Sequence, residues 1–351
     1  MEKVYIVAAQ RTPIGKFNGQ LASKSAVELG AIAIKAAVEK AKLSGNDIDQ
    51  VLMGNVIQAG TGQNPARQAS MAAGLGEQVP AITINDVCAS GMSSVNLAAS
   101  LIRAGQANVI VAGGMESMSQ APYVLPKARN GYRFGNGTLL DAMQSDALND
   151  VYGGYPMGIT AENINDKYQI TRRQQDEFAL LSHQRAVKAQ KAGYFDSEIV
   201  PVEVKQKRTT VTVKVDEAPR SDTSLVALAK LKPAFKSDGS VTAGNASGIN
   251  DGGAALVLAS ESAVNQLGLT PLAEWQGSAV VGLDPALMGL GPYYAINKLL
   301  KNQQMAADDV DTYEINEAFA TQALVCQELL HLDPNAVNPW GGAIALGHPV
   351  G

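Results

Sequence analysis

The chain has 351 residues, of which 46% are hydrophobic and 17% are charged, and its formal net charge is −5. This composition is typical of a soluble globular protein that is long enough for two or three structural units. The negative charge and the lack of a long basic run argue against nucleic acid as a partner. No apolar stretch reaches the roughly 20 residues that cross a bilayer, so we expect no membrane span.

The few cysteines and histidines exclude several kinds of site. Two cysteines cannot form a disulfide framework in a chain this long, which favours a reducing compartment, the cytoplasm. A strand-like run starts just after Met1, so we expect no secretory leader. The sequence has no Cys/His spacing of a zinc site, no Gly-x-Ser-x-Gly elbow and no phosphate-loop lysine. Metal, hydrolase and nucleotide-cleaving chemistry are therefore not indicated.

Residues 1–118 alternate between predicted strands and helices. Ser25 and Glu28 form a capping box that predicts a helix reaching about Lys42. Short and nearly continuous apolar runs separate such helices, which predicts an α/β layer with a largely parallel sheet. The runs that predict buried strands are 4–9, 51–53, 81–84 and 108–112.

Cys88 lies on a tight turn between the predicted strand 81–84 and a predicted helix over 93–104. Unpaired backbone N–H groups and the helix dipole favour a thiolate at such a helix N-terminus. The small residues Ala89, Ser90 and Gly91 leave room for a substrate. A free cysteine is also commonly a small buried apolar residue, so the turn alone leaves both interpretations open.

Residues 119–249 are predicted to be an excursion that lies over the core. Residues 119–158 contain many Gly, Pro, Asn and Tyr residues and show no clear period. Thr171 and Gln174 cap a predicted polar helix that ends near residue 192, and two alternating runs at 198–204 and 209–215 predict exposed strands. Long irregular segments of this kind usually carry function.

Residues 250–351 echo the first part of the chain. Residues 33–49 can be laid over 295–311 without a gap, and in both copies a helix leads through an acidic turn to a strand. The counterpart of the Cys88 turn falls at 337–341, and the sequence stops at Gly351 before a matching helix and strand. We therefore expect the second half to be truncated at its C-terminus.

Other candidate residues are ambiguous when they are taken singly. Asn316 is expected where a helix begins, which is also the place of an ordinary N-cap. His348 stands in a turn between Gly347 and Pro349, where a histidine is more often part of a plain loop. Cys326 is in line with apolar helical positions and is predicted to be core. His183 and His331 lie on polar helical stretches and are predicted to be surface residues.

Taken together, the motifs resemble the thiolase family, and among thiolases the biosynthetic acetyl-CoA acetyltransferases. The resemblance covers the whole chain and implies a duplicated five-layered αβαβα core, built from 1–118 and an incomplete 250–351, with a CoA-binding loop domain at 119–249. The motifs that carry it are AQRTPIG at 9–15, VCASG at 87–91, GGMESM at 113–118, MGITAEN at 157–163, ASGINDG at 246–252, NEAF at 316–319 and GHP at 347–349.

The resemblance implies a mechanism in which Cys88 takes up the acetyl group of acetyl-CoA and His348 accepts the thiol proton. Asn316 would hold a water that, with His348, stabilises the enolate oxygen of a second acetyl-CoA. The Cys88 N–H would serve another oxyanion site, where one donor is typically worth about 3 kcal/mol of barrier. The product would be acetoacetyl-CoA, in a reversible reaction.

The resemblance also implies contacts with coenzyme A, which is a substrate and product here and not a bound cofactor. Ser247 would bind the pantetheine arm and Arg220 would lie near the adenine end. A homo-oligomer is expected, commonly a dimer or tetramer, with 119–141 as the site of tetramer contacts. The remaining residues that would contact the substrate are Leu148, Met157, Met288, Ala318, Phe319, Ala243 and Gly248.

Two departures from the family pattern qualify these expectations. The family carries a second catalytic cysteine in a Cys-x-Gly motif after GHP, and this sequence has none there, so we expect the chain to be inactive in condensation. Pro156 stands where many biosynthetic members have a histidine. The alternatives are a 3-ketoacyl-CoA thiolase for longer chains and a non-catalytic thiolase-like protein that binds acyl-CoA or lipid.

Overall fold

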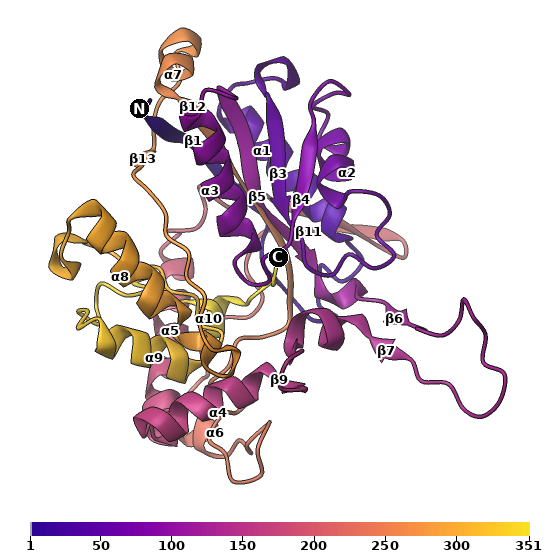
Figure 1. The fold of residues 1–351 in the computed structure, drawn as a ribbon, viewed down its shortest axis with the longest axis vertical. Helices are drawn as coiled ribbons and strands as arrows, with labels where there is room; N and C mark the ends of the chain where they lie inside the picture. The colour runs from indigo at the N-terminus through magenta and orange to yellow at the C-terminus, as the bar shows by residue number, and fades with distance from the viewer. Residues whose placement is uncertain (1) are drawn as a thin grey trace.

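One mixed β-sheet organises the first half of the molecule in the computed structural model, which describes residues 2–351 (Figure 1). Its strands follow the order β13-β1-β12-β5-β3-β4, and a short β2 pairs with β12. The strands are β1 (Val4–Arg11), β2 (Gly15–Lys16), β3 (Gln50–Gly54), β4 (Ala81–Ile84), β5 (Val109–Ser117), β12 (Asn250–Ser260) and β13 (Ala273–Trp275).

The sheet is parallel on one side only. β3 runs parallel to β4 and β5, but β12 is antiparallel to β5 and β1, and β1 is antiparallel to β13. The prediction of a largely parallel sheet is therefore wrong, since four of the six strand pairings described in this sheet are antiparallel. β12 enters from the excursion and not from a helical crossover, so nothing forces it to be parallel. It also lies in the centre of the first sheet, so residue 250 does not mark an edge of this layer.

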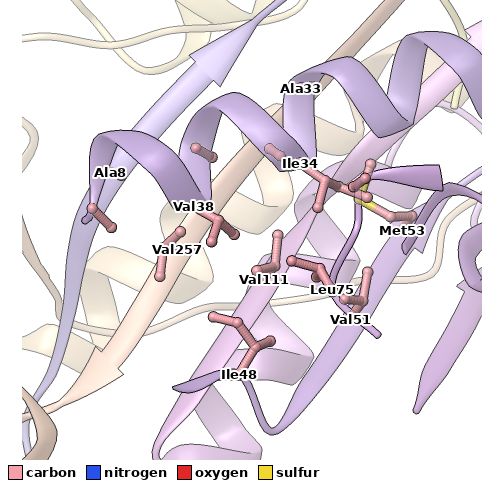
Figure 2. Close-up of a cluster of buried hydrophobic side chains, with 14 of the residues drawn as sticks. Ala8, Ala33, Ile34, Val38, Ile48, Val51, Met53, Leu75, Val111 and Val257 are labelled. Atoms are coloured by element: carbon pink, nitrogen blue, oxygen red, sulfur yellow. The ribbon is translucent and has the colours of Figure 1, made fainter. Parts of the chain in front are cut away.

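Helices cover both faces of the sheet. α1 (Ala26–Lys40) and α2 (Pro65–Ala72) pack on one face, and α3 (Ser90–Arg103) packs on the other. Figure 2 shows Ile34 and Val38 of α1 directed toward Val111 and Val257 of the sheet, and all four are buried. The predicted capping box of Ser25 and Glu28 is present. Burying these apolar side chains stabilises the layer that carries the Cys88 turn.

Helices of the inserted segment and of the C-terminal part form a second body below the sheet (Figure 1). A long arm extends between β6 and β7. The two strands predicted at 198–204 and 209–215 are present as the hairpin of β10 and β11, but one face of this hairpin is buried against Leu21 and Leu29. α5 begins at the predicted Thr171 capping box. The elements are β6 (Tyr123–Val124), β7 (Leu140–Asp141), β8 (Asn149–Asp150), β9 (Tyr155–Pro156), α4 (Met157–Tyr168), α5 (Arg172–Lys191), β10 (Val202–Gln206), β11 (Thr209–Val213) and α6 (Leu225–Ala229).

The rest of the chain is mainly helical. The repeat predicts a strand that ends near Asn316, but within residues 2–351 this segment forms only an isolated bridge, between Tyr313 and Val337. The duplicated core is thus seen as a complete sheet only for the first half. The helices are α7 (Glu261–Leu267), α8 (Gly291–Gln303), α9 (Ala320–Leu329) and α10 (Ala343–Leu346), and the short turns of helix are η1 (Gly45–Asp47), η2 (Met118–Gln120), η3 (Gln144–Leu148), η4 (Pro285–Leu290) and η5 (Ala307–Asp309). None of the helices in the part described is long and apolar enough to cross a membrane.

Arg11 ties the inserted body to the sheet. Its guanidinium lies 2.7 Å from Asp216 Oδ1 and 2.7 Å from Glu198 Oε1. The Asp216 side chain is fully buried, and its Oδ1 also accepts the backbone N–H of Ile14. Arg11 stacks over the ring of Phe195, 5.2 Å from its centroid. These contacts join the end of β1 to the inserted segment.

Asp216→Ala is expected to lower the free energy of unfolding by about 3 kcal/mol, because it leaves the Arg11 charge partly buried with one partner fewer. The midpoint of urea-induced unfolding measures this change. Glu203→Ala on the exposed face of β10 is the control and should change stability by less than about 0.5 kcal/mol. Equal shifts for the two variants would contradict the assignment.

Candidate active site

A strained turn presents Cys88. β4 ends at Ile84, Ala89 is the N-cap of α3, and Val87 between them has φ of +47°. A β-branched residue with positive φ is rare and costs about 1–3 kcal/mol, and such strain is found mainly at functional sites. The buried Ser90 hydroxyl accepts the N–H of Asp86 and donates to the carbonyl of Val87. The turn is thereby locked.

The thiol of Cys88 is not the thiolate that the helix position predicts. Cys88 is exposed at the surface of the chain, yet the surrounding protein withholds enough water to raise the pKa of its thiol to about 11. Burial outweighs the hydrogen bond from its own backbone N–H, which lowers the pKa. The thiol is therefore protonated near neutral pH, and it needs a base before it can act as a nucleophile.

Asn316 and His348 lie side by side. Asn316 Nδ2 is 3.4 Å from His348 Nε2, and the carbonyl of Asn316 accepts the Nε2–H of Gln322. Asn316 is not the N-cap that its position suggested, because α9 begins at Ala320 with Phe319 as its N-cap. The Asn316 side chain is thus free to contact His348. Desolvation lowers the pKa of His348 to about 4, so its imidazole is neutral and can accept a proton.

The segment that follows His348 leads back to the Cys88 turn. The His348 N–H donates to Asn250 Oδ1, 2.9 Å away, on the central strand of the sheet. Three residues later, the Gly351 carbonyl lies 3.5 Å from the place that a Cβ on Gly91 would occupy, in the first turn of α3. Gly351 N–H donates to the buried carboxyl of Glu116, which also accepts the N–H of Val56. The structure thus brings Asn316 beside His348, and the chain that follows His348 reaches the first turn of α3, which begins just after Cys88.

Four of the predicted CoA-binding residues share one apolar cluster. Met157 from α4, Met288 from η4 and Ala318 and Phe319 from the NEAF turn pack together around Val241. Ser247 lies beside this cluster, since its backbone N–H donates to the Ala318 carbonyl at 2.9 Å. Leu148 belongs to another cluster, with Val350 and Ile249. Ala243 and Gly248 are exposed on the same segment as Ser247.

Phe235 belongs to this site and was missed from sequence. Its ring meets that of Phe319 edge-on, with centroids 6.1 Å apart. A Cβ at Gly158 would overlap the Phe235 ring, so the Gly in MGITAEN is what allows this contact. Phe235 lies outside every quoted motif, and its own neighbours give no periodic signal. Only the folded chain brings it to the cluster.

His183 is buried, which corrects the prediction of a surface residue. It is 7% exposed, and its Nδ1 accepts the backbone N–H of Arg220 over 3.2 Å. Burial, with the nearby charge of Arg220, lowers its pKa to about 4. His183 and Arg220 line a cavity of about 560 Å³ together with Lys188 and Lys191. The cavity is basic, which fits an anionic group.

Among residues 2–351, no three or more His, Cys, Asp or Glu side chains gather as a metal site would require.

His183 and His348 are expected to stay neutral down to about pH 4, whereas an ordinary histidine has a pKa near 6.5. The unfolded chain binds these protons more readily, so their contribution to stability is complete above about pH 6.5 and is lost as the pH falls toward 4. Histidine-labelled NMR measures the midpoints, with His348→Asn to assign its signal. A midpoint near 6.5 for His348 would show that its ring is solvated or paired with a thiolate.

Comparisons with known proteins agree with this geometry. Residues 4–262 match the family of the thiolase N-terminal domain, and residues 269–351 match that of the thiolase C-terminal domain. The chain is 53% identical to an acetyl-CoA acetyltransferase of Escherichia coli strain K12, over 100% of this chain and 89% of that one. Its fold is similar to the crystal structures of a Bacillus anthracis acetyl-CoA acetyltransferase (TM-score 0.98, 45% identity) and a human mitochondrial 3-ketoacyl-CoA thiolase (TM-score 0.96, 43% identity), with 100% and 89% of the two chains covered in each case.

These relatives align along the whole of this chain, so they lend no support to the expected truncation of the second half or to the expected inactivity in condensation. Both halves are matched by their own family, at a level of identity that shows common descent. The chain belongs to the thiolases.

Proposed function

We propose that this thiolase is an acetyl-CoA C-acetyltransferase that joins two molecules of acetyl-CoA into acetoacetyl-CoA and CoA, reversibly. One observation carries the proposal: the Asn316–His348 pair stands beside the segment that runs to the Cys88 turn. The similar proteins of Escherichia coli and Bacillus anthracis are acetyl-CoA acetyltransferases, which supports the choice of acetyl-CoA.

In the first half-reaction, the Cys88 sulfur attacks the thioester carbonyl carbon of acetyl-CoA while neutral His348 accepts the thiol proton. A new carbon–sulfur bond forms to Cys88 and the bond to CoA breaks. The proton returns from His348 to the CoA sulfur, which leaves as a thiol. Because the pKa of Cys88 is about 11, the proton leaves as the bond forms, and free thiolate does not need to accumulate.

In the second half-reaction, a general base takes a proton from the methyl group of a second acetyl-CoA, and the resulting carbon attacks the acetyl group on Cys88. The bond between Cys88 and the acetyl carbon breaks, and the base returns its proton to the Cys88 thiolate, so that no proton is gained or lost overall. Asn316 and His348 would face the enolate oxygen of the second acetyl-CoA through a water. Preorganised donors of this kind stabilise charge only as it develops, which lowers the barrier.

The rest of the CoA molecule would extend from the apolar cluster toward the basic cavity. The cluster of Met157, Met288 and Phe319 suits the acyl group and the pantetheine arm, with Ser247 beside it. The cavity with Arg220, Lys188 and Lys191 suits the phosphates at the adenine end. Ala243, Gly248 and Leu148 would border the arm between the two.

A thiolase for longer 3-ketoacyl-CoA chains is the second candidate. Pro156 is the N-cap of α4, directly before Met157, so this position offers no side-chain donor to the pantetheine arm. The human 3-ketoacyl-CoA thiolase named above has nearly the same fold. Comparing the thiolysis of acetoacetyl-CoA with that of a 3-ketoacyl-CoA of about ten carbons would separate the two.

The chain would act as a cytoplasmic homo-oligomer. The arm between β6 and β7 exposes Tyr123, Phe134 and Leu139, which are 64%, 101% and 61% accessible. Apolar side chains on a projecting arm favour contacts with another copy. Light scattering would give the mass of the particle.

Brief exposure to acetyl-CoA is expected to add one acetyl group to the protein, seen by intact mass, and none to Cys88→Ala. Peptide mapping should place the group on Cys88, since Cys326 is fully buried. Cys88→Ala keeps the volume of the turn nearly unchanged and is the control for non-specific acetylation. Tight binding of acetyl-CoA without acetylation of folded protein would instead support a non-catalytic binding protein.

A further inference from the structure

Glu317, the residue after Asn316, is a buried carboxyl group at the centre of the second half. It is 1% exposed. Its Oε2 accepts the Ser182 hydroxyl at 2.7 Å and the Ile344 N–H at 3.2 Å, and its Oε1 accepts Asn338 Nδ2–H at 2.8 Å. Within residues 2–351, no cation lies within ion-pair distance of it. Three donors, and not an opposite charge, compensate for its burial.

Each donor belongs to an element that borders the reacting pair. Asn338 also bonds the N–H and the carbonyl of Ile315, so it fixes the backbone directly before Asn316. Ile344 lies in α10, four residues before His348. Ser182 lies on α5, one residue from His183 and the basic cavity. One carboxyl therefore touches the supports of Asn316 and of His348 at the same time.

The packing around the carboxyl leaves little freedom. A Cβ at Gly342 would overlap the Glu317 carboxyl group, and Gly342 N–H donates to the same Ser182 oxygen that donates to Glu317. The start of α10 therefore packs on the Glu317 carboxyl group. A shift of the carboxyl group or of α10 would also displace His348. By contrast, the apolar cluster that includes Phe319 contains none of the three donors.

We propose that Glu317 is a positioning residue that holds Asn316 and His348 in the geometry that the reaction at Cys88 needs. This rests on the proposed function, because the effect is defined on the acetylation of Cys88. The carboxylate acts through its capacity to accept three hydrogen bonds. An amide of the same shape must turn an NH₂ group toward either Asn338 or Ile344, which are both donors.

A purely structural role would make a different prediction. If Glu317 only stabilises the fold, its substitution lowers the fraction of folded sites, but each folded site still reacts at the parental rate. A positioning residue leaves the fraction of competent sites intact and slows each of them. The amplitude and the rate constant of a single-turnover acetylation separate the two cases.

Glu317→Gln should acetylate Cys88 about 10- to 100-fold more slowly in a single turnover, because small displacements of reacting groups cost rates of this order. The amplitude, counted as acetyl groups per chain by intact mass, should match the parent. The half-saturating acetyl-CoA concentration should change by less than about twofold, since Ser247 and the apolar cluster are not moved.

Glu314→Gln is the matched control. It makes the same change from carboxyl to amide, two residues before Asn316, but among the described residues the Glu314 side chain has no hydrogen-bond partner. Its rate should stay within about twofold of the parent. Ser182→Ala is the second test if Glu317→Gln does not fold. It removes one donor and should slow acetylation severalfold, and in a folded double variant the two effects should not add.

The inference is overturned if Glu317→Gln, or Ser182→Ala in its place, acetylates at the parental rate, or if only the amplitude falls. It is also overturned if Glu314→Gln slows the reaction equally, since charge near the site would then be the cause. If the parent protein itself does not acetylate Cys88, the proposed function is refuted. This outcome differs from failure of the inference, which is seen only when the variants are compared with an active parent.

Discussion

The relative placement of Cys88 and His348 is the constraint on which this site depends. The pKa of the thiol is raised to about 11 and that of the imidazole is lowered to about 4, so both groups are neutral at ordinary pH. A neutral thiol is a poor nucleophile, and a neutral imidazole is a proton acceptor. The reaction then depends on the transfer of one proton from Cys88 to His348 while the bond between Cys88 and the acetyl carbon forms. Its rate therefore depends on how accurately the two side chains are positioned.

The fold meets this requirement by holding residues 344–351 through hydrogen bonds to buried groups. α10 begins where Ile344 N–H bonds the buried carboxyl of Glu317, and the segment ends where Gly351 N–H bonds the buried carboxyl of Glu116. Between them, His348 N–H bonds Asn250 on the central strand. A loop held at three points by hydrogen bonds can keep a histidine in place without being part of a regular element. Gly54 and Gly114 allow Gly351 to approach the backbone of the first half closely, because a Cβ at either position would overlap the Gly351 carbonyl oxygen.

Local signals in the sequence predicted local structure well. The capping boxes at Ser25 and Thr171 are confirmed, because both partners of each box lie within one helical turn. The turn at Cys88 is confirmed as well, since a strand, small residues and a helix follow each other directly. The candidate site came from motif order, and the structure brings Asn316 beside His348.

What the sequence could not predict depends on contacts between distant residues. The direction of β12 depends on which strands flank it, and no local pattern records that. His183 has a polar helical sequence around it, but the backbone of Arg220, 37 residues away, covers it. The pKa of Cys88 follows from the atoms packed around the turn, which outweigh the helix N-terminus that the sequence does reveal. In the sequence Glu317 is only one residue of the NEAF motif, and its three hydrogen-bond donors come from distant parts of the chain.

The dependence of Cys88 acetylation on His348 and on pH tests this account most directly. In single turnovers of the parent and of His348→Ala, we expect the variant to be about 10²- to 10⁴-fold slower at pH 7, the range typical of a lost general base. The difference in acetylation rate between the parent and His348→Ala should become steadily smaller as the pH rises to 10, because the Cys88 thiol then begins to ionise without a base. A variant that reacts at the parental rate at pH 7 would contradict the account, since Cys88 would then be a thiolate by itself.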